Sequence, residues 1–141
     1  MGQSIVGRFT KMSKILYYPA LYKHFKGDVY CTKFISRPAP TTRLHLQYDK
    51  INFDESIWAR HTETNRVIKI FKLNGVYYHQ TELDNQPLVI YNCVNNMEKS
   101  EVYARPIYMF LSKVDKLKYP DCEQEYRFEQ FNDAYAYVME D

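Results

Sequence analysis

The segment from Glu101 to Val114, EVYARPIYMFLSKV, is the part of the sequence best suited to hold a charged group in a fixed place. Arg105 directly precedes Pro106, and this pair separates a strand-like alternation from a helical pattern of apolar residues. The residue before a proline favours an extended backbone and proline fits the first turn of a helix, so we expect Arg105 at a stiff strand-to-helix corner. A guanidinium held there can bind a carboxylate or a phosphate in a bidentate manner. An ion pair with a neighbouring surface Glu is an equally good interpretation.

Two other polar segments carry candidate ligand-binding side chains: a basic aromatic loop at Tyr22–Gly27 and the turn at His61–Thr64. If these segments meet Arg105 at one rim of a barrel, their cations would bind phosphates and Tyr or Trp would stack on a base. Asn92 or Thr62 would then contact ribose or the base edges. The predicted ligand-binding set is Arg105, Arg60, His61, Thr62, Tyr103, Asn92, Lys23, His24 and Trp58.

The same residues also fit ordinary turns. His61–Thr64 matches a turn closed by its own Ser/Thr or Asx-type hydrogen bonds, with Glu63 as a structural cap. For Glu63 and Thr64 we favour that structural role. For Arg60, His61 and Arg105 the ligand-binding interpretation carries at least equal weight.

The sequence contains none of the common catalytic motifs. G-x-S-x-G, H-E-x-x-H, the P-loop and G-x-G-x-x-G are all missing, and four glycines leave little room for a glycine-rich phosphate loop. We therefore predict no catalytic residues and a non-enzymatic protein. Catalysis by an arrangement without a sequence motif, such as a Cys and a His that meet only in space, stays open.

Cysteine and histidine spacing indicates neither a disulfide framework nor a metal site. Cys31, Cys93 and Cys122 are odd in number, far apart and outside any C-x-x-C pair, and the four histidines lack metal-ligand spacing. We predict no metal, no cofactor and a reducing, cytoplasmic location. No stretch is apolar enough to span a membrane, and a net charge of +2 without a basic stripe argues against duplex DNA as a partner.

The hydrophobic pattern predicts a mainly β, β-rich α+β fold: a small antiparallel barrel or strongly bent sheet with an inserted hairpin and one or two short helices. Residues 1–16 are expected to form an arm or short helix and 17–28 a loop. Pro38 and Pro40 should end strand pairing or move it to an edge. Asn74-Gly75 is the strongest hairpin signal. A short helix is expected from Pro106 to Val114, and the tail is expected to be a short helix or a frayed end. The expected strands are 29–36, 43–48, 51–59, 66–73, 76–83, 88–94, 101–105 and 123–131.

Five sequence blocks, taken in order, resemble a small bacterial and phage family, the domain of unknown function 1653. They are YKHFKG at Tyr22–Gly27, ARHTET at Ala59–Thr64, PLVIY at Pro87–Tyr91, VYARPIYMFL at Val102–Leu111, and KYPD…YRFE at Lys118–Glu129. The resemblance implies a compact β-rich domain at 17–141 after an arm at 1–16. Residues 38–58 and 66–86 then stand as insertions. The resemblance implies no activity, because the family has none that can be transferred.

Three hypotheses of different classes follow. The first is a ligand-binding protein, such as a phage anti-defence protein that sequesters a nucleotide-derived immune signal of the cyclic ADP-ribose or cyclic oligonucleotide type in the host cytoplasm. The second is a protein-interaction module or inhibitor of a host or defence enzyme, with the Tyr-rich strands as its surface. The third is a single-stranded nucleic-acid-binding barrel. Because the inserted strands add edges that need covering, we also predict a homodimer.

Overall fold

The computed structural model describes residues 7–11, 14–40 and 55–130. The expected strand at 43–48, the start of the expected strand at 51–59 and the tail beyond 130 lie outside these residues. Two short helical elements are present, a 3₁₀ helix η3 (Met97–Lys99) and α2 (Ile107–Phe110). The strands are β1 (Gly7–Lys11), β2 (Lys14–Tyr18), β3 (Ala20–His24), β4 (Val29–Ala39), β5 (Ile57–His61), β6 (Arg66–Leu73), β7 (Val76–Gln80), β8 (Leu88–Cys93), β9 (Val102–Pro106) and β10 (Phe128–Gln130).

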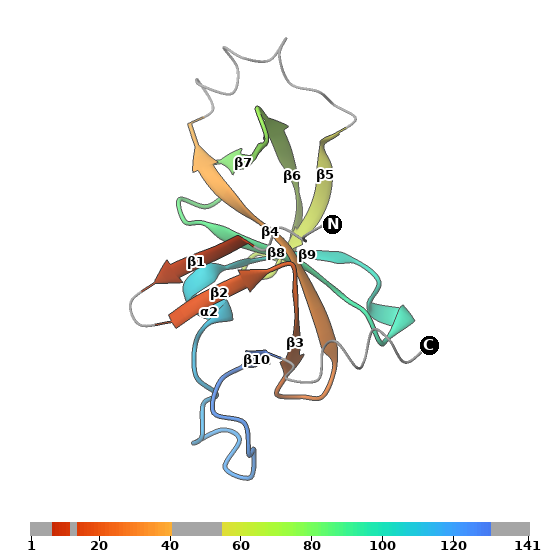
Figure 1. The fold of residues 1–141 in the computed structure, drawn as a ribbon, viewed down its shortest axis with the longest axis vertical. Helices are drawn as coiled ribbons and strands as arrows, with labels where there is room; N and C mark the ends of the chain where they lie inside the picture. Colours follow the sequence, from red (N-terminus) through yellow and green to blue (C-terminus); the bar gives the residue numbers. More distant parts are fainter. Residues whose placement is uncertain (1–6, 12–13, 41–54, 131–141) are drawn as a thin grey trace, which may run out of the picture.

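Six of the described strands close into a barrel, which confirms the mainly β fold (Figure 1). The order is β4-β7-β6-β5-β9-β8, and β8 pairs again with β4 to complete the circle. Two of the junctions, β4–β7 and β5–β9, are parallel and the others are antiparallel. Long β4 makes closure possible because it pairs with β8 along one stretch and with β7 further on.

The β6–β7 hairpin forms where the sequence predicts it. Asn74 and Gly75 have positive φ angles of 52° and 81°, as a two-residue turn of the type favoured between twisted strands requires. On β6, Ile68 and Ile70 are buried, while Lys69 between them is partly exposed. The alternation therefore sets which face of the hairpin points into the barrel.

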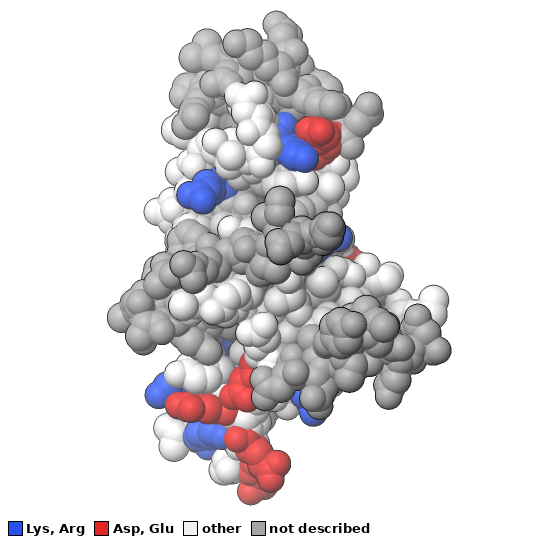
Figure 2. Space-filling view, viewed as in Figure 1, with Lys and Arg blue, Asp and Glu red and all other residues white. Residues whose placement is uncertain are grey.

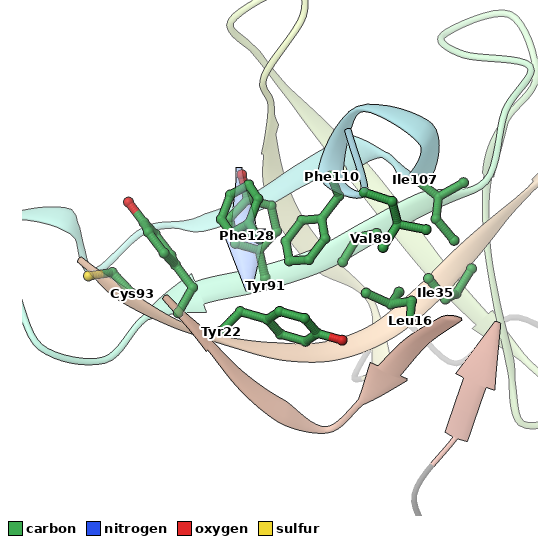
Figure 3. Close-up of a cluster of buried hydrophobic side chains, with 11 residues drawn as sticks. Leu16, Tyr22, Ile35, Val89, Tyr91, Cys93, Ile107, Phe110 and Phe128 are labelled. Atoms are coloured by element: carbon green, nitrogen blue, oxygen red, sulfur yellow. The ribbon is translucent and has the colours of Figure 1, made fainter. Parts of the chain in front are cut away.

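The buried side chains form two separate cores, one on each side of the β8–β9 pair. The inner core fills the barrel with Ala59, Ile68, Ile70, Leu88, Ile90 and Ala104. The outer core lies against the other face of the same strands and is covered by β2, β3, α2 and β10 (Figure 3). Because β8 is buried on both faces, with Leu88 turned to the inner core and Val89 to the outer one, its sequence is almost continuously apolar.

Aromatic rings dominate the outer core. The rings of Phe110 and Phe128 are stacked at a centroid distance of 4.0 Å, and Tyr22 and Tyr91 each meet Phe110 edge-on at 5.3 Å (Figure 3). Such stacked and edge-to-face pairs add to the free energy gained from burial alone. Part of the aromatic content of the chain is thus explained by this core.

The N-terminal predictions are wrong for the described residues. Instead of an arm or short helix, β1 and β2 form an antiparallel hairpin, and the expected loop at 17–28 contains β3, which pairs with β4. Leu16 is fully buried in the outer core. This short apolar run is stabilised by tertiary packing, which local periodicity does not reveal.

Three element boundaries also differ from the predictions. β4 continues through Pro38. Its pairing with β8 ends at Ser36, so at Pro38 only β7 is paired with β4 and a proline without an N–H is tolerated there. The helix after Pro106 ends at Phe110 rather than at residue 114. Arg60 and His61, expected in a turn, are the last residues of β5.

No helix in the described part of the chain is long and apolar enough to cross a membrane.

Candidate functional site

The expected corner at Arg105 is present. β9 ends at Pro106, α2 begins at Ile107, and the Ile107 N–H donates to the carbonyl oxygen of Pro87 at 3.1 Å. Arg105 Nε donates to the hydroxyl of buried Tyr91 at 2.9 Å, and its Cζ lies 5.7 Å from the centre of the Phe128 ring. These contacts hold the guanidinium at the edge of the outer core, and its Nη atoms have no hydrogen bond to a described residue.

The turn between β3 and β4 brings a second group of polar side chains to the same place. The His24 N–H donates to the Asp28 carbonyl and the Gly27 N–H to the His24 carbonyl, both at 2.8 Å. Gly27 has a φ of 114°, which favours glycine at this position. The Phe25 N–H donates to the carbonyl oxygen of Arg127 at 2.9 Å, so the turn is tied directly to the segment that leads into β10.

His24 is neutral at physiological pH in this setting. Burial lowers its pKa to about 4, and the nearby charges of Arg105, Lys26, Lys99 and Arg127 act in the same direction. Its Nδ1 accepts a hydrogen bond from the Lys26 N–H at 3.1 Å, so the ring proton of the neutral imidazole is on Nε2. His24 therefore supplies an uncharged N–H donor.

The loop between α2 and β10 closes the site. The Arg127 N–H donates to the Ser112 carbonyl at 2.9 Å, and one side-chain oxygen of Asp115 accepts from the Leu117 N–H at 3.0 Å. This folding places Tyr119 edge-on against Phe25 at a centroid distance of 5.0 Å. The loop is therefore held by backbone hydrogen bonds that fix its aromatic ring beside the β3–β4 turn.

Together these segments surround a hollow of about 300 Å³, which we call the basic hollow. Its four permanent cations, Lys26, Arg105, Lys118 and Arg127, form no ion pair with any carboxylate of the described residues. The Asp115 carboxylate is the single acidic group of the lining, and one of its oxygens binds backbone amides. The complete lining is His24, Phe25, Lys26, Arg105, Asp115, Lys118, Tyr119 and Arg127.

A larger hollow of about 670 Å³ adjoins the basic hollow and shares Phe25, Lys26, Lys118 and Tyr119 with it. Its remaining wall has mixed charge, with Lys23 on one side and Asp121 and Glu123 on the loop. Acidic and basic side chains are accordingly interspersed at the lower end of the molecule, where this loop lies (Figures 1 and 2). The basic hollow thus suits an anion, and the larger hollow leaves room for the rest of a ligand.

The structure brings together part of the predicted ligand-binding set. Arg105 and His24 line the basic hollow, and Lys23 lines the adjoining one. Tyr103 packs against Tyr91 behind them, at a centroid distance of 5.6 Å, and does not line either hollow. The Asn92 amide donates to the carbonyl oxygen of Cys93.

The other predicted residues are on β5 and the turn after it, and they line neither hollow. Arg60 Nε donates to Glu101 at 2.7 Å in a surface ion pair. His61 is buried and bonds through Nε2 to Asp84 at 2.8 Å and through Nδ1 to the Thr64 hydroxyl at 2.9 Å. Thr62 donates to Glu63, and Trp58 is exposed on β5. The backbone of the His61–Thr64 turn lies beside the Arg105 corner, because His61 is paired with Ala104 and the Thr62 N–H donates to the Ala104 carbonyl oxygen at 2.9 Å. Its side chains nevertheless line neither hollow.

Six lining residues were missing from the predicted set: Phe25, Lys26, Asp115, Lys118, Tyr119 and Arg127. All of them except Asp115 fall within the blocks YKHFKG, KYPD and YRFE on which the family resemblance is based. Treating these blocks as possible neighbours in space, instead of as markers of a fold, would have found those five.

Among the described residues, no three His, Cys, Asp or Glu side chains gather as metal ligands. Ser36 Oγ lies 2.7 Å from His79 Nδ1, but both side chains are completely buried, and His79 Nε2 donates to the Asp84 carbonyl at 2.9 Å. A serine without solvent access cannot meet a substrate, so this pair is a structural contact between β4 and β7, and His79 extends it to Asp84 after β7.

Comparisons of the chain with protein-family models, with curated proteins and with solved structures give no match.

Proposed function

We propose that this protein is a non-enzymatic binding protein for a phosphorylated, nucleotide-like small molecule. The observation that carries the proposal is the basic hollow, in which four cations without carboxylate partners among the described residues surround about 300 Å³ beside two aromatic rings. A pocket of this size with converging cations is suited to an anionic ligand. Unpaired cations held close together repel one another, and a bound phosphate would relieve that repulsion.

Each lining group has a distinct role in this proposal. Arg105 is fixed through Nε by Tyr91, so its Nη atoms, which have no hydrogen bond to a described residue, would take a phosphate oxygen, with Arg127 as the second guanidinium. The Lys26 ammonium lies near both the Phe25 and the Tyr119 ring, 5.7 and 5.6 Å from their centres, and adds charge next to a stacking surface. A base would stack on Tyr119 and extend into the larger hollow, which shares that ring.

The biological role we propose is sequestration of a nucleotide-derived immune signal by a phage anti-defence protein. Such a protein needs a tight site for phosphates and a base, and it needs no chemistry at that site. The described lining of the basic hollow offers phosphate and base contacts without a nucleophile hydrogen-bonded to a general base, in keeping with capture rather than turnover.

Thermal melting against AMP, ADP, ADP-ribose, a cyclic ADP-ribose and cyclic di- and trinucleotides tests the proposal. A ligand that binds the folded state raises the melting temperature once its concentration exceeds the dissociation constant. We expect one member of the panel to do so, and Arg127→Gln to reduce the shift. Lys33→Gln removes an equal charge from an exposed position outside the hollow and should leave the shift unchanged. A flat panel, or equal loss in both variants, would contradict the proposal.

A further inference from the structure

A second surface, on the outside of the barrel, carries rings and cations side by side. We call it the outer band and define it as Trp58, Arg60, Val67, Lys69, Phe71 and Tyr78. Trp58 is paired with Lys69, Arg60 with Val67, and Phe71 with Tyr78 across β5, β6 and β7. The intervening residues Ala59, Ile68 and Ile70 are buried in the inner core, so the outer band occupies the opposite face of these strands.

Trp58 is unusually exposed for its type. It is the single tryptophan of the chain, and 61 % of its surface is accessible, while Val67 on the neighbouring strand is 47 % exposed. Large apolar side chains exposed next to one another commonly mark an interaction surface. Neither residue lines the basic hollow.

Positive charge accompanies every part of this surface. The Lys69 ammonium lies 5.5 Å from the centre of the Trp58 ring and 5.6 Å from that of Phe71. Exposed Arg37 of β4 is paired with Tyr78. β5, β6 and β7 contain no Asp or Glu, and they contain Arg60, Arg66, Lys69 and Lys72. The band thus combines stacking surfaces with strands whose charged side chains are all basic.

We propose that the outer band binds single-stranded nucleic acid, independently of the basic hollow. Bases would stack on Trp58 and the neighbouring rings, and the backbone phosphates would lie along Lys69, Arg37 and Arg60. Arg60 would exchange its exposed ion pair with Glu101 for a phosphate, a change that costs little because exposed pairs are weak. Flat, exposed rings flanked by cations on the face of a barrel suit an extended chain of planar bases better than an apolar peptide, which needs a groove.

The intrinsic fluorescence of Trp58 gives a direct readout, because no other tryptophan contributes. We expect an unlabelled twelve-nucleotide dT or rU strand to quench the Trp58 fluorescence to saturation. The ratio of the affinities for the two strands then shows whether the band prefers DNA or RNA. A labelled strand followed by anisotropy should bind Trp58→Ala about 5- to 150-fold more weakly, the range given by the loss of one stacked base. Trp58→Phe should retain most of the affinity. Lys69→Gln should lower the slope of log affinity against log salt by about 0.7.

Matched variants distinguish strand binding at the outer band from binding elsewhere on the protein. Leu117→Ala removes a fully exposed apolar side chain outside the band, and Lys118→Gln alters the basic hollow; neither should change strand binding. Heparin should compete without quenching Trp58. Absence of quenching at physiological salt, unchanged binding by Trp58→Ala, or loss of binding in Lys118→Gln instead would overturn the proposal.

Discussion

Replacing Arg105 by methionine separates the two roles that the structure gives this side chain. Arg105 Nε donates to the hydroxyl of Tyr91, which is 2 % exposed, and Arg105 lines the basic hollow. Methionine fills similar space without a donor, so the buried hydroxyl loses its partner. We expect the free energy of unfolding to fall by about 1–3 kcal/mol for that reason.

Ligand affinity should fall in the same variant by a separable amount. Loss of a charge-assisted hydrogen bond to a phosphate costs about 1.5–3 kcal/mol, which corresponds to an affinity about 10- to 150-fold weaker. The double variant Arg105→Met/Tyr91→Phe removes both partners of the internal bond. It should recover most of the lost stability, because no buried hydroxyl is left unpaired, but none of the affinity.

Calorimetric titration with the nucleotide that gives the largest melting shift measures the affinities, and urea unfolding measures the stabilities. Affinity in Arg105→Met equal to that of the unmodified protein would refute the placement of Arg105 in the binding site. Affinity that returns together with stability in the double variant would show that Arg105 acts only by supporting the fold.

The histidine in the hollow, the aromatic core, the hairpin turn and the oligomeric state can each be tested separately. The pKa of His24 is about 4 in the folded protein and about 6.5 in the unfolded chain. As the pH falls, the unfolded chain therefore binds a proton at His24 before the folded protein does. Stability should therefore fall by about 1–2 kcal/mol, allowing for solvent screening, as the pH drops from 6.5 towards 4, and urea unfolding of His24→Gln should lack this component. Phe110→Ala should cost about 3–5 kcal/mol in unfolding free energy, because the ring is fully buried and stacked on Phe128. Gly75 has a φ of 81°, which strains any residue with a Cβ, so Gly75→Ala should lower the free energy of unfolding by about 1 kcal/mol and the melting temperature with it. Light scattering should give twice the mass of one chain if the predicted homodimer forms.

The parts of the fold that follow from local pattern could be predicted from the sequence. Alternation located β6, Asn74-Gly75 located its turn, and the nearly continuous apolar run of β8 indicated a central strand. β2 and β3 could not be located in this way. Their short apolar runs are stabilised by contacts with β4 and the outer core, and a local pattern does not contain those partners.

The site was predictable only in part, for a related reason. The Arg-Pro pair identified the corner at Arg105 because proline restricts its own backbone and that of its neighbour. Arg127 and Tyr119 come from a long loop whose course is fixed by bonds such as that from the Arg127 N–H to Ser112. His61 looked equally suited to a ligand, but Asp84, more than twenty residues away in the sequence, is its partner. Which polar side chains are already bonded is a property of the tertiary structure.

The central claim, that the basic hollow holds a phosphorylated ligand, is tested most directly by NMR titration of the His24 ring. The imidazole lies in the hollow with its pKa lowered to about 4 by burial and by surrounding cations. A phosphate bound there adds negative charge next to the ring. We predict that the nucleotide panel contains a ligand that shifts the His24 resonances saturably and raises the pKa of His24. The ring resonances of His61 and His79, which are buried outside the hollow, should not shift. His24 resonances and a His24 pKa that no member of the panel changes would contradict this claim.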